Sequence, residues 1–235
     1  MSIAENIAAI RAQMNEAALA AGRDPKDILL CAATKMNDAD AVRQAIAGGV
    51  DCCGENRVQE LTAKLSEDAY RGAPVHFIGH LQTNKVKQVV GKVDLIQSVD
   101  SLRLMEAINK EAARQGIRQD ILLEINIGGE ASKSGFSKED IHPILEQMVK
   151  YPNLFVRGLM CIPPISQEPG KNSKFFQEIF NLSVDIMRKK YGNVCMDFMS
   201  MGMSDDFTDA IACGSNMIRI GTAIFGARNY ANSHQ

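Results

Sequence analysis

Short apolar runs alternate with amphipathic segments along almost the whole chain. Eight of these runs have strand length, and the segments between them repeat their apolar residues at helical spacing. Glycines stand where several of the helical segments stop, as is typical of helix ends. We therefore predict strands at 28–34, 50–56, 75–80, 94–99, 120–128, 154–162, 195–201 and 217–221, and helices at 2–21, 39–47, 57–70, 84–90, 101–116, 138–150, 173–191 and 206–213.

The order of these elements indicates a parallel sheet. Strands separated by helical segments require right-handed crossover connections, and near-continuous apolar strands are typical of sheets covered on both faces. Eight such units in 235 residues predict a (β/α)8 TIM barrel with an extra N-terminal helix; a doubly wound open sheet is the structural alternative. Because no linker or change of composition divides the chain, we expect a single domain over residues 1–235.

The composition is that of an ordinary soluble globular protein, with 46% hydrophobic and 23% charged residues. The net charge of −2 without any basic block argues against a nucleic-acid partner. No apolar run is long enough to span a membrane. Glu5, Arg11 and Glu16 interrupt the N-terminal segment, unlike the apolar core of a signal peptide, so we expect a cytoplasmic protein.

The spacing of cysteine and histidine gives no metal signature. No two cysteines form a C-x-x-C pair and most lie in apolar runs, so we expect buried free thiols. His76 and His80 are four residues apart on the predicted strand 75–80, hence on one face. We interpret them as packing residues rather than a metal pair, because no third ligand is evident. The cysteines are Cys31, Cys52, Cys53, Cys161, Cys195 and Cys213.

Two polar glycine turns follow the last two predicted strands. Residues 200–204 and 219–222 each lead into helical sequence, and a helix N-terminus offers free backbone N–H groups and a positive dipole end. In a barrel of this kind, phosphate commonly binds at the loops after strands seven and eight. The alternative is that Gly202 and Gly221 serve only tight turns. The chain contains neither G-x-G-x-x-G nor G-x-x-x-x-G-K-[ST], which disfavours dinucleotides and nucleoside triphosphates.

Lys35 ends the first predicted strand and would point into the barrel mouth, where desolvation lowers the pKa of a lysine and makes its amine a better nucleophile. A phosphate site opposite such a lysine suggests a phosphorylated aldehyde held as a Schiff base, pyridoxal 5′-phosphate being the common one. A solvated or salt-bridged lysine, or an aldolase acting on a sugar phosphate, would look similar. Glu55, Asn56 and His80 follow other strands and are expected at the same mouth.

With these residues in place, the chain resembles the YggS/PROSC family of pyridoxal phosphate homeostasis proteins, whose fold is the alanine racemase N-terminal barrel. The resemblance extends over almost the whole chain and keeps the family order of motifs. The matching segments are AATK (32–35), GENRVQE (54–60), HFIGHLQTNK (76–85), QSVDS (97–101), EINIGGEASKSGF (124–136), GLMCIPP (158–164), and SMGMSDDFTDAIACGS with IRIGTAIFG within 200–226.

The resemblance implies a role for each candidate residue. Lys35 would be the Schiff-base lysine, and Arg219 would face the pyridine nitrogen. Asn56 and His80 would lie beside the cofactor. The phosphate would be cradled by Ser200, Gly202, Ser204, Gly221 and Thr222. Two departures affect the rim: Met36-Asn37-Asp38 follows the lysine where the family often has a Lys-Pro-like pair, and Arg57 replaces an aromatic residue.

The implied function is storage, buffering or delivery of pyridoxal phosphate by a monomer, with cofactor-dependent apoenzymes as recipients. An amino-acid racemase is the alternative. A two-base racemase needs an acid–base group on each face of the cofactor, and the only late tyrosines are Tyr191 and Tyr230. An arginine at the pyridine nitrogen also disfavours ring protonation and gives a poorer electron sink. We therefore expect a carrier without turnover.

Overall fold

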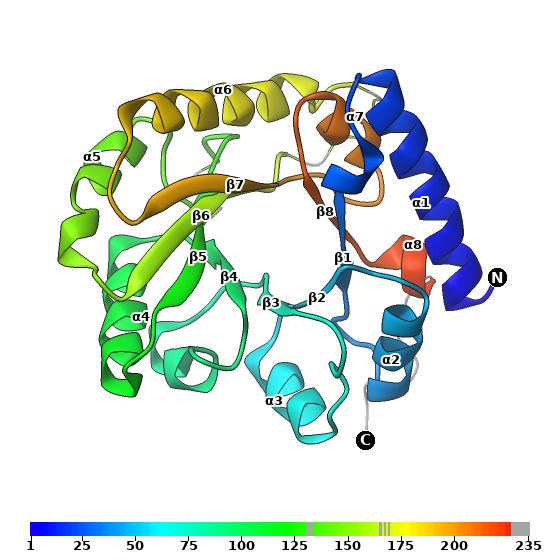
Figure 1. Ribbon diagram of the computed structural model, residues 1–235, viewed down its shortest axis with the longest axis horizontal. Coiled ribbons are helices and arrows are strands. Elements are labelled where there is room, and N and C mark those ends of the chain that lie inside the picture. Colours follow the sequence, from blue (N-terminus) through cyan, green and yellow to red (C-terminus); the bar gives the residue numbers. More distant parts are fainter. Residues whose placement is uncertain (131–133, 165, 167, 169, 227–235) are drawn as a thin grey trace.

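Eight parallel strands close into a barrel in their order along the chain (Figure 1). The computed structural model describes residues 1–130, 134–164, 166, 168 and 170–226. β1 pairs with β8 and closes the sheet. The predicted (β/α)8 barrel is therefore confirmed, and the alternative of a doubly wound open sheet is wrong. The strands are β1 Leu29–Ala33, β2 Cys52–Glu55, β3 Val75–Phe77, β4 Leu95–Val99, β5 Gln119–Ile125, β6 Leu154–Cys161, β7 Val194–Ser200 and β8 Met217–Ile220.

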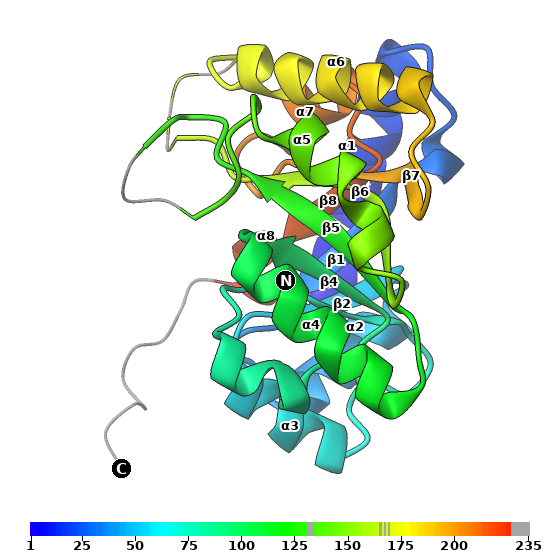
Figure 2. The same cartoon turned by 90° about the vertical axis from the view of Figure 1, so that its left-hand side faces the viewer.

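Helices surround the barrel and cover its outer face (Figures 1 and 2). Asp38 caps α2 by accepting from the N–H of Ala41 at 2.8 Å, and Gly116 ends α4 in the left-handed conformation. No helix among the described residues has the length and apolar character needed to cross a membrane. The helices are α1 Ile3–Ala20, α2 Ala39–Ala47, α3 Val58–Ser66, α4 Leu102–Gln115, α5 Ile141–Glu146, α6 Ser173–Lys189, α7 Phe207–Ala212 and α8 Thr222–Phe225.

Several predicted elements differ from the structure in length or type. The helix expected at 57–70 ends at Ser66, because Asp68 adopts a left-handed φ of 53°. The helix expected at 84–90 is a 3-10 helix, Thr83–Gln88. The strand expected at 75–80 ends at Phe77, so His80 lies outside it and does not share a strand face with His76.

The helix expected at 138–150 is also shorter than predicted. It begins at Ile141 as α5 and is followed by a separate 3-10 turn, Met148–Lys150. The hydroxyl of Ser137 accepts from the N–H of Asp140 at 3.2 Å, as an N-cap does, but residues 138–140 form a turn ahead of the helix.

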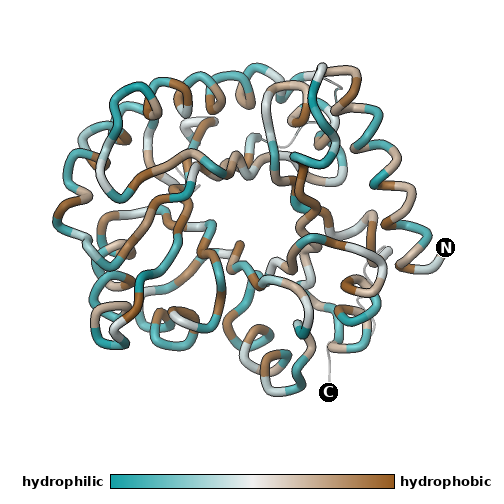
Figure 3. The backbone as a smooth tube through the Cα atoms, viewed as in Figure 1, coloured by the Kyte–Doolittle hydropathy of each residue, from teal (hydrophilic) through white to brown (hydrophobic). Residues whose placement is uncertain are grey.

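Two apolar layers build the core. The larger one packs between strands and helices, and Figure 3 shows hydrophobic strands around the centre with hydrophilic turns on the outer helices. A smaller inner layer fills the barrel itself, and we call it the inner core layer. Its buried members are Cys31, Cys52, Leu95, Leu122, Met160 and Met217.

The extra N-terminal helix braces the end of the barrel. α1 packs against α7 and α8, the helices that follow β7 and β8. The side chain of Asn6 donates to the carbonyl of Ile224 at 2.9 Å, and Arg23 donates to the carbonyls of Ile211 and Ser215. A capping box of Ser2 and Glu5 fixes the start of α1. The turns after β7 and β8 are therefore supported from behind.

Candidate functional site

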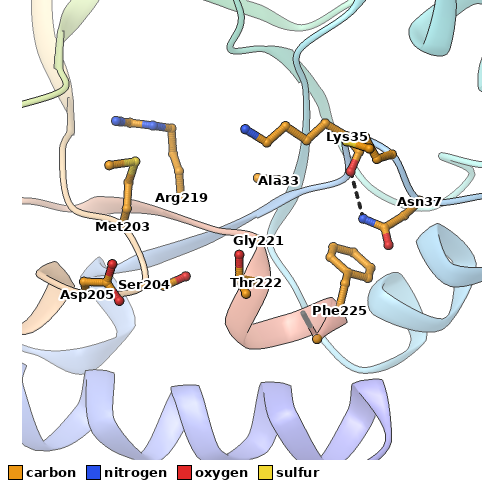
Figure 4. A pocket seen from close by; sticks show the side chains of 12 residues that line it. Ala33, Lys35, Asn37, Met203, Ser204, Asp205, Arg219, Gly221, Thr222 and Phe225 are labelled. Atoms are coloured by element: carbon orange, nitrogen blue, oxygen red, sulfur yellow. Dashed lines mark hydrogen bonds between the residues drawn. The ribbon is translucent and has the colours of Figure 1, made fainter. Parts of the chain in front are cut away.

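A cavity of about 450 Å³ lies where β1, β7 and β8 end (Figure 4). The carboxyl ends of barrel strands are the usual position of active sites in this fold. Of the predicted residues, Lys35, Ser204, Arg219, Gly221 and Thr222 line it. The remaining lining residues are Ala33, Met36, Asn37, Met203, Asp205, Phe225 and Gly226.

Lys35 reaches the cavity from a tight turn after β1. Met36 has a left-handed φ of 62°, and its N–H donates to Glu60 Oε2 at 2.6 Å. The amide of Asn37 donates to the carbonyl of Lys35 at 3.0 Å. The residues that depart from the family pattern therefore hold this turn. In Figure 4 the Lys35 side chain extends across the cavity toward Arg219.

Arg219 is buried and held by three hydrogen bonds. Its Nη1 donates to the carbonyl and to the hydroxyl of Ser200, each at 2.7 Å, and its Nη2 donates to the carbonyl of Cys161 at 2.9 Å. Burial lowers the pKa of Arg219, and nearby acidic groups oppose this effect. The cavity wall thus carries a guanidinium in a fixed orientation.

The two turns after β7 and β8 present free donors to the cavity. Within the described part of the chain, the backbone N–H groups of Ser204, Asp205 and Thr222 donate to no protein acceptor. Figure 4 shows the hydroxyl of Ser204 directed toward Thr222, and the hydroxyl of Thr222 directed into the space between Arg219 and Lys35. This donor set fits a phosphate group, and a primary amine and a guanidinium lie along the same cavity.

The structure requires glycine at position 202 more strictly than at position 221. Gly202 has a φ of 96°, and a Cβ there would lie 2.7 Å from Ala210 Cβ and 3.0 Å from Phe207 Cα. Glycine at this position lets the turn pack directly on α7. A Cβ on Gly221 would make only ordinary contacts at 3.5 Å to Ala33.

Ser200 does not line the cavity but lies beneath Arg219. It is fully buried, and its hydroxyl donates to Gln97 Oε1 at 2.6 Å while accepting from Arg219. The Gln97 amide contacts His76 Nδ1 at 2.8 Å. These contacts form a continuous hydrogen-bond chain from Arg219 at the cavity to His76 inside the barrel. Sequence analysis gave Gln97 no role, although it is a polar residue within an apolar strand and begins the family-like segment QSVDS.

Glu124 is a second residue that sequence analysis missed. It lies two residues after Leu122 of the inner core layer, so it faces the barrel interior. Burial raises its pKa, the charge of Asp100 adds to this, and Arg219 and His80 oppose it. Glu55, expected at the mouth, instead points outward and pairs with Lys64 at 2.6 Å.

Asn56 and His80 line a separate hollow of about 160 Å³. His80 is largely exposed, and its Nδ1 lies 3.0 Å from Asp100 Oδ2. The buried Oδ1 of Asn56 has no hydrogen-bond partner among the described residues. The structure therefore separates these two predicted residues from the cavity that contains Lys35. The rest of the hollow is formed by Arg57, Val58, Gln59, Gln82 and Lys85.

The fold and these strand-end groups define a barrel of the alanine racemase N-terminal type. The sequence model of the alanine racemase N-terminal domain matches residues 2–229. An alanine racemase from Streptomyces lavendulae, at 12% identity, has a TM-score of 0.73 over 96% of this chain and 58% of its own, which shows the shared fold.

Closer relatives narrow the assignment. A pyridoxal phosphate homeostasis protein of Pseudomonas aeruginosa is 40% identical over 229 residues, covering 97% of each chain. PipY of Synechococcus elongatus, solved with PLP bound, is 31% identical, with a TM-score of 0.82 over 96% of this chain and 100% of PipY. The chain belongs to the family of pyridoxal phosphate homeostasis proteins.

Proposed function

We propose that this chain binds pyridoxal phosphate as a Schiff base on Lys35 and stores, buffers or delivers it without catalytic turnover. One observation carries the proposal: Lys35, Arg219 and the donors of two turns line a single cavity of about 450 Å³. When bound, the cofactor supplies an amine-reactive aldehyde and a ring that can accept electrons. A PLP-bound relative with the same fold supports this ligand.

Each lining group has a role in binding. The Lys35 amine holds the cofactor covalently, and the N–H groups and hydroxyls of Ser204 and Thr222 bind its phosphate, with Gly221 in the same turn. Ser200 and Gly202 act from behind the cavity, as supports for Arg219 and for the turn before α7. Asn56 and His80 lie beside the cofactor, in the neighbouring hollow.

Arg219 faces the pyridine nitrogen in this proposal. Its fixed positive charge disfavours a proton on that nitrogen, because the two charges would repel. A ring without that proton withdraws electrons less strongly, which suits a carrier better than an enzyme that must stabilise a carbanion.

The lining side chains also favour a carrier. Among the described residues of the cavity, the titratable ones are Lys35, Asp205 and Arg219, with no tyrosine. Tyr191 lies elsewhere, 2.7 Å from His142 Nδ1 between α5 and α6; Tyr230 falls outside the described residues. No second base opposite Lys35 is therefore assigned, and racemisation remains the alternative. In this proposal a cytoplasmic monomer of one domain delivers the cofactor to apoenzymes.

The decisive experiment is borohydride reduction of the cofactor-loaded protein, followed by peptide mapping and absorbance spectroscopy. We expect the label on Lys35 and a visible Schiff-base band, both absent in Lys35→Ala. Lys85→Ala, in the hollow that contains Asn56 and His80, is the matched control and should label normally. A label that persists in Lys35→Ala, or a wild-type protein that takes up no cofactor, would overturn the proposal.

A further inference from the structure

Three soft ligand groups meet inside the barrel, below the cavity. Cys31, Cys52 and His76 come from β1, β2 and β3, and their sulfur and ring nitrogen atoms all lie within 4.8 Å of one another. Cys31 and Cys52 are direct register partners on adjacent strands. All three side chains are buried, with relative exposures of 0%, 2% and 6%.

The three residues bring the chemistry of a thiophilic metal ion. Cysteine thiolates and imidazole together select Zn²⁺ and related soft cations over Mg²⁺ or Ca²⁺. The inner core layer is apolar, and the buried guanidinium of Arg219 lies on β8 as the register partner of Cys31, so a further net positive charge is disfavoured there. Two thiolates and a neutral imidazole balance one Zn²⁺, so the complex carries no net charge. Met217, whose Sδ lies 3.1 Å from Gln97 Nε2, is a further soft donor in this layer.

Gln97 gives His76 the partner that a metal-binding histidine needs. Ligating histidines usually donate their other ring N–H to an oxygen, which fixes the ring. The amide nitrogen of Gln97 lies 2.8 Å from Nδ1 of His76, so Nε2 is the ring nitrogen that remains for a metal. Turning the Gln97 amide by 180° places its oxygen at Nδ1, and Ser200 can then accept from the amide nitrogen.

We propose that Cys31, Cys52 and His76 form a binding site for one Zn²⁺ ion in the barrel core. Binding displaces the protons of both thiols to solvent and leaves the cysteines reduced. Since the site is buried, the ion enters during folding and is retained afterwards. The proposal does not depend on the cofactor assignment, because it rests on three residues that do not line the cavity.

The test is elemental analysis of the full chain after refolding with Zn²⁺ and washing with a weak chelator. We expect about one Zn²⁺ per chain in the wild type, and at least a tenfold loss in Cys31→Ser and Cys52→Ser. Cys53→Ser is the matched control: Cys53 is the next residue on β2, equally buried, and belongs to the outer layer. It should keep the metal.

A second readout guards against variants that fail to fold. Co²⁺ in place of Zn²⁺ should give the wild type a near-ultraviolet thiolate charge-transfer band, which His76→Gln should shift or weaken. A wild type that retains neither metal would overturn the proposal. So would metal content unchanged by Cys31→Ser, or a Cys31–Cys52 disulfide in the protein as isolated.

Discussion

At the scale of single residues, the orientation of Arg219 depends on groups outside the cavity. Ser200 supplies two of its three acceptors, one from the backbone and one from the side chain. The hydroxyl also connects Arg219 to Gln97. Removing it leaves the backbone acceptor in place, so the guanidinium should stay in the cavity but become less fixed.

Ser200→Ala should therefore weaken cofactor binding by about 1 kcal/mol, or about fivefold in Kd, because one buried hydrogen bond to a charged group is lost. Titration of the purified variant with pyridoxal phosphate checks this. Ser66→Ala is the control, since its exposed hydroxyl donates to the carbonyl of Ala63 within the same helix. Equal affinities in the two variants would contradict the supporting role of Ser200.

Glu124 makes stability depend on pH. Burial raises its pKa above the ordinary value of 4.5, so the folded state holds the proton more tightly than the unfolded chain does. Its contribution is fully present below that value and is lost as pH rises through the folded pKa. Glu124→Gln keeps a neutral group throughout.

We therefore expect the free energy of unfolding of Glu124→Gln, relative to wild type, to grow as the pH is raised above the ordinary glutamate pKa of 4.5. Denaturant unfolding at several pH values measures it. Glu106→Gln, on the exposed face of α4, is the matched control for replacing a glutamate by glutamine. A difference that stays constant with pH would show that Glu124 titrates normally in the folded protein.

At the scale of elements, the turn between β7 and α7 needs glycine for two separable reasons. Gly202 combines a left-handed φ with close contacts to Ala210 and Phe207. Gly49, between α2 and β2, has a similar φ of 91° but no atom within 4 Å of an added Cβ. The pair therefore separates backbone strain from packing.

Gly49→Ala should lose about 1 kcal/mol of stability through strain alone. Gly202→Ala should lose about 1–3 kcal/mol more, because α7 must move away from the turn. Only Gly202→Ala should also weaken cofactor binding, since the displaced turn carries Ser204. Thermal unfolding and cofactor titration of both variants check this. Similar losses in both would mean that the contacts to α7 are easily relieved.

Element positions were predictable where the local signal was strong. The eight apolar runs predicted the barrel order, and Lys35 and the turns with Ser204, Gly221 and Thr222 were found from their places at strand ends. Arg219 was singled out by the family resemblance. The sequence did not predict the place of a residue where that place depends on the direction in which its side chain points. Ser200 turns under Arg219, and Glu55 turns out toward Lys64. The cluster of Cys31, Cys52 and His76 arises from strand closure, which spacing along the chain does not reveal.

At the scale of the whole molecule, the cavity is formed by the two ends of the barrel sequence. Lys35 follows β1 and the two turns proposed to bind phosphate follow β7 and β8, so the cavity forms only when β1 pairs with β8. α1 secures this closure from outside by packing on α7 and α8. A binding site at the point where β1 and β8 close the barrel can hold a ligand firmly while its rim stays open to other proteins. This arrangement suits the proposed release of the cofactor.

Loaded wild-type protein should thus restore the activity of a cofactor-dependent apoenzyme, while racemising amino acids no faster than free pyridoxal phosphate does. In the proposed function Lys35 holds the cofactor, and the described cavity contains no tyrosine that could serve as the second base. Apoenzyme reactivation and chiral analysis of an amino acid measure the two activities. Borohydride-reduced protein is the control for transfer, since its fixed cofactor cannot leave. Racemisation well above the free cofactor, and lost in Lys35→Ala, would establish the enzyme alternative instead.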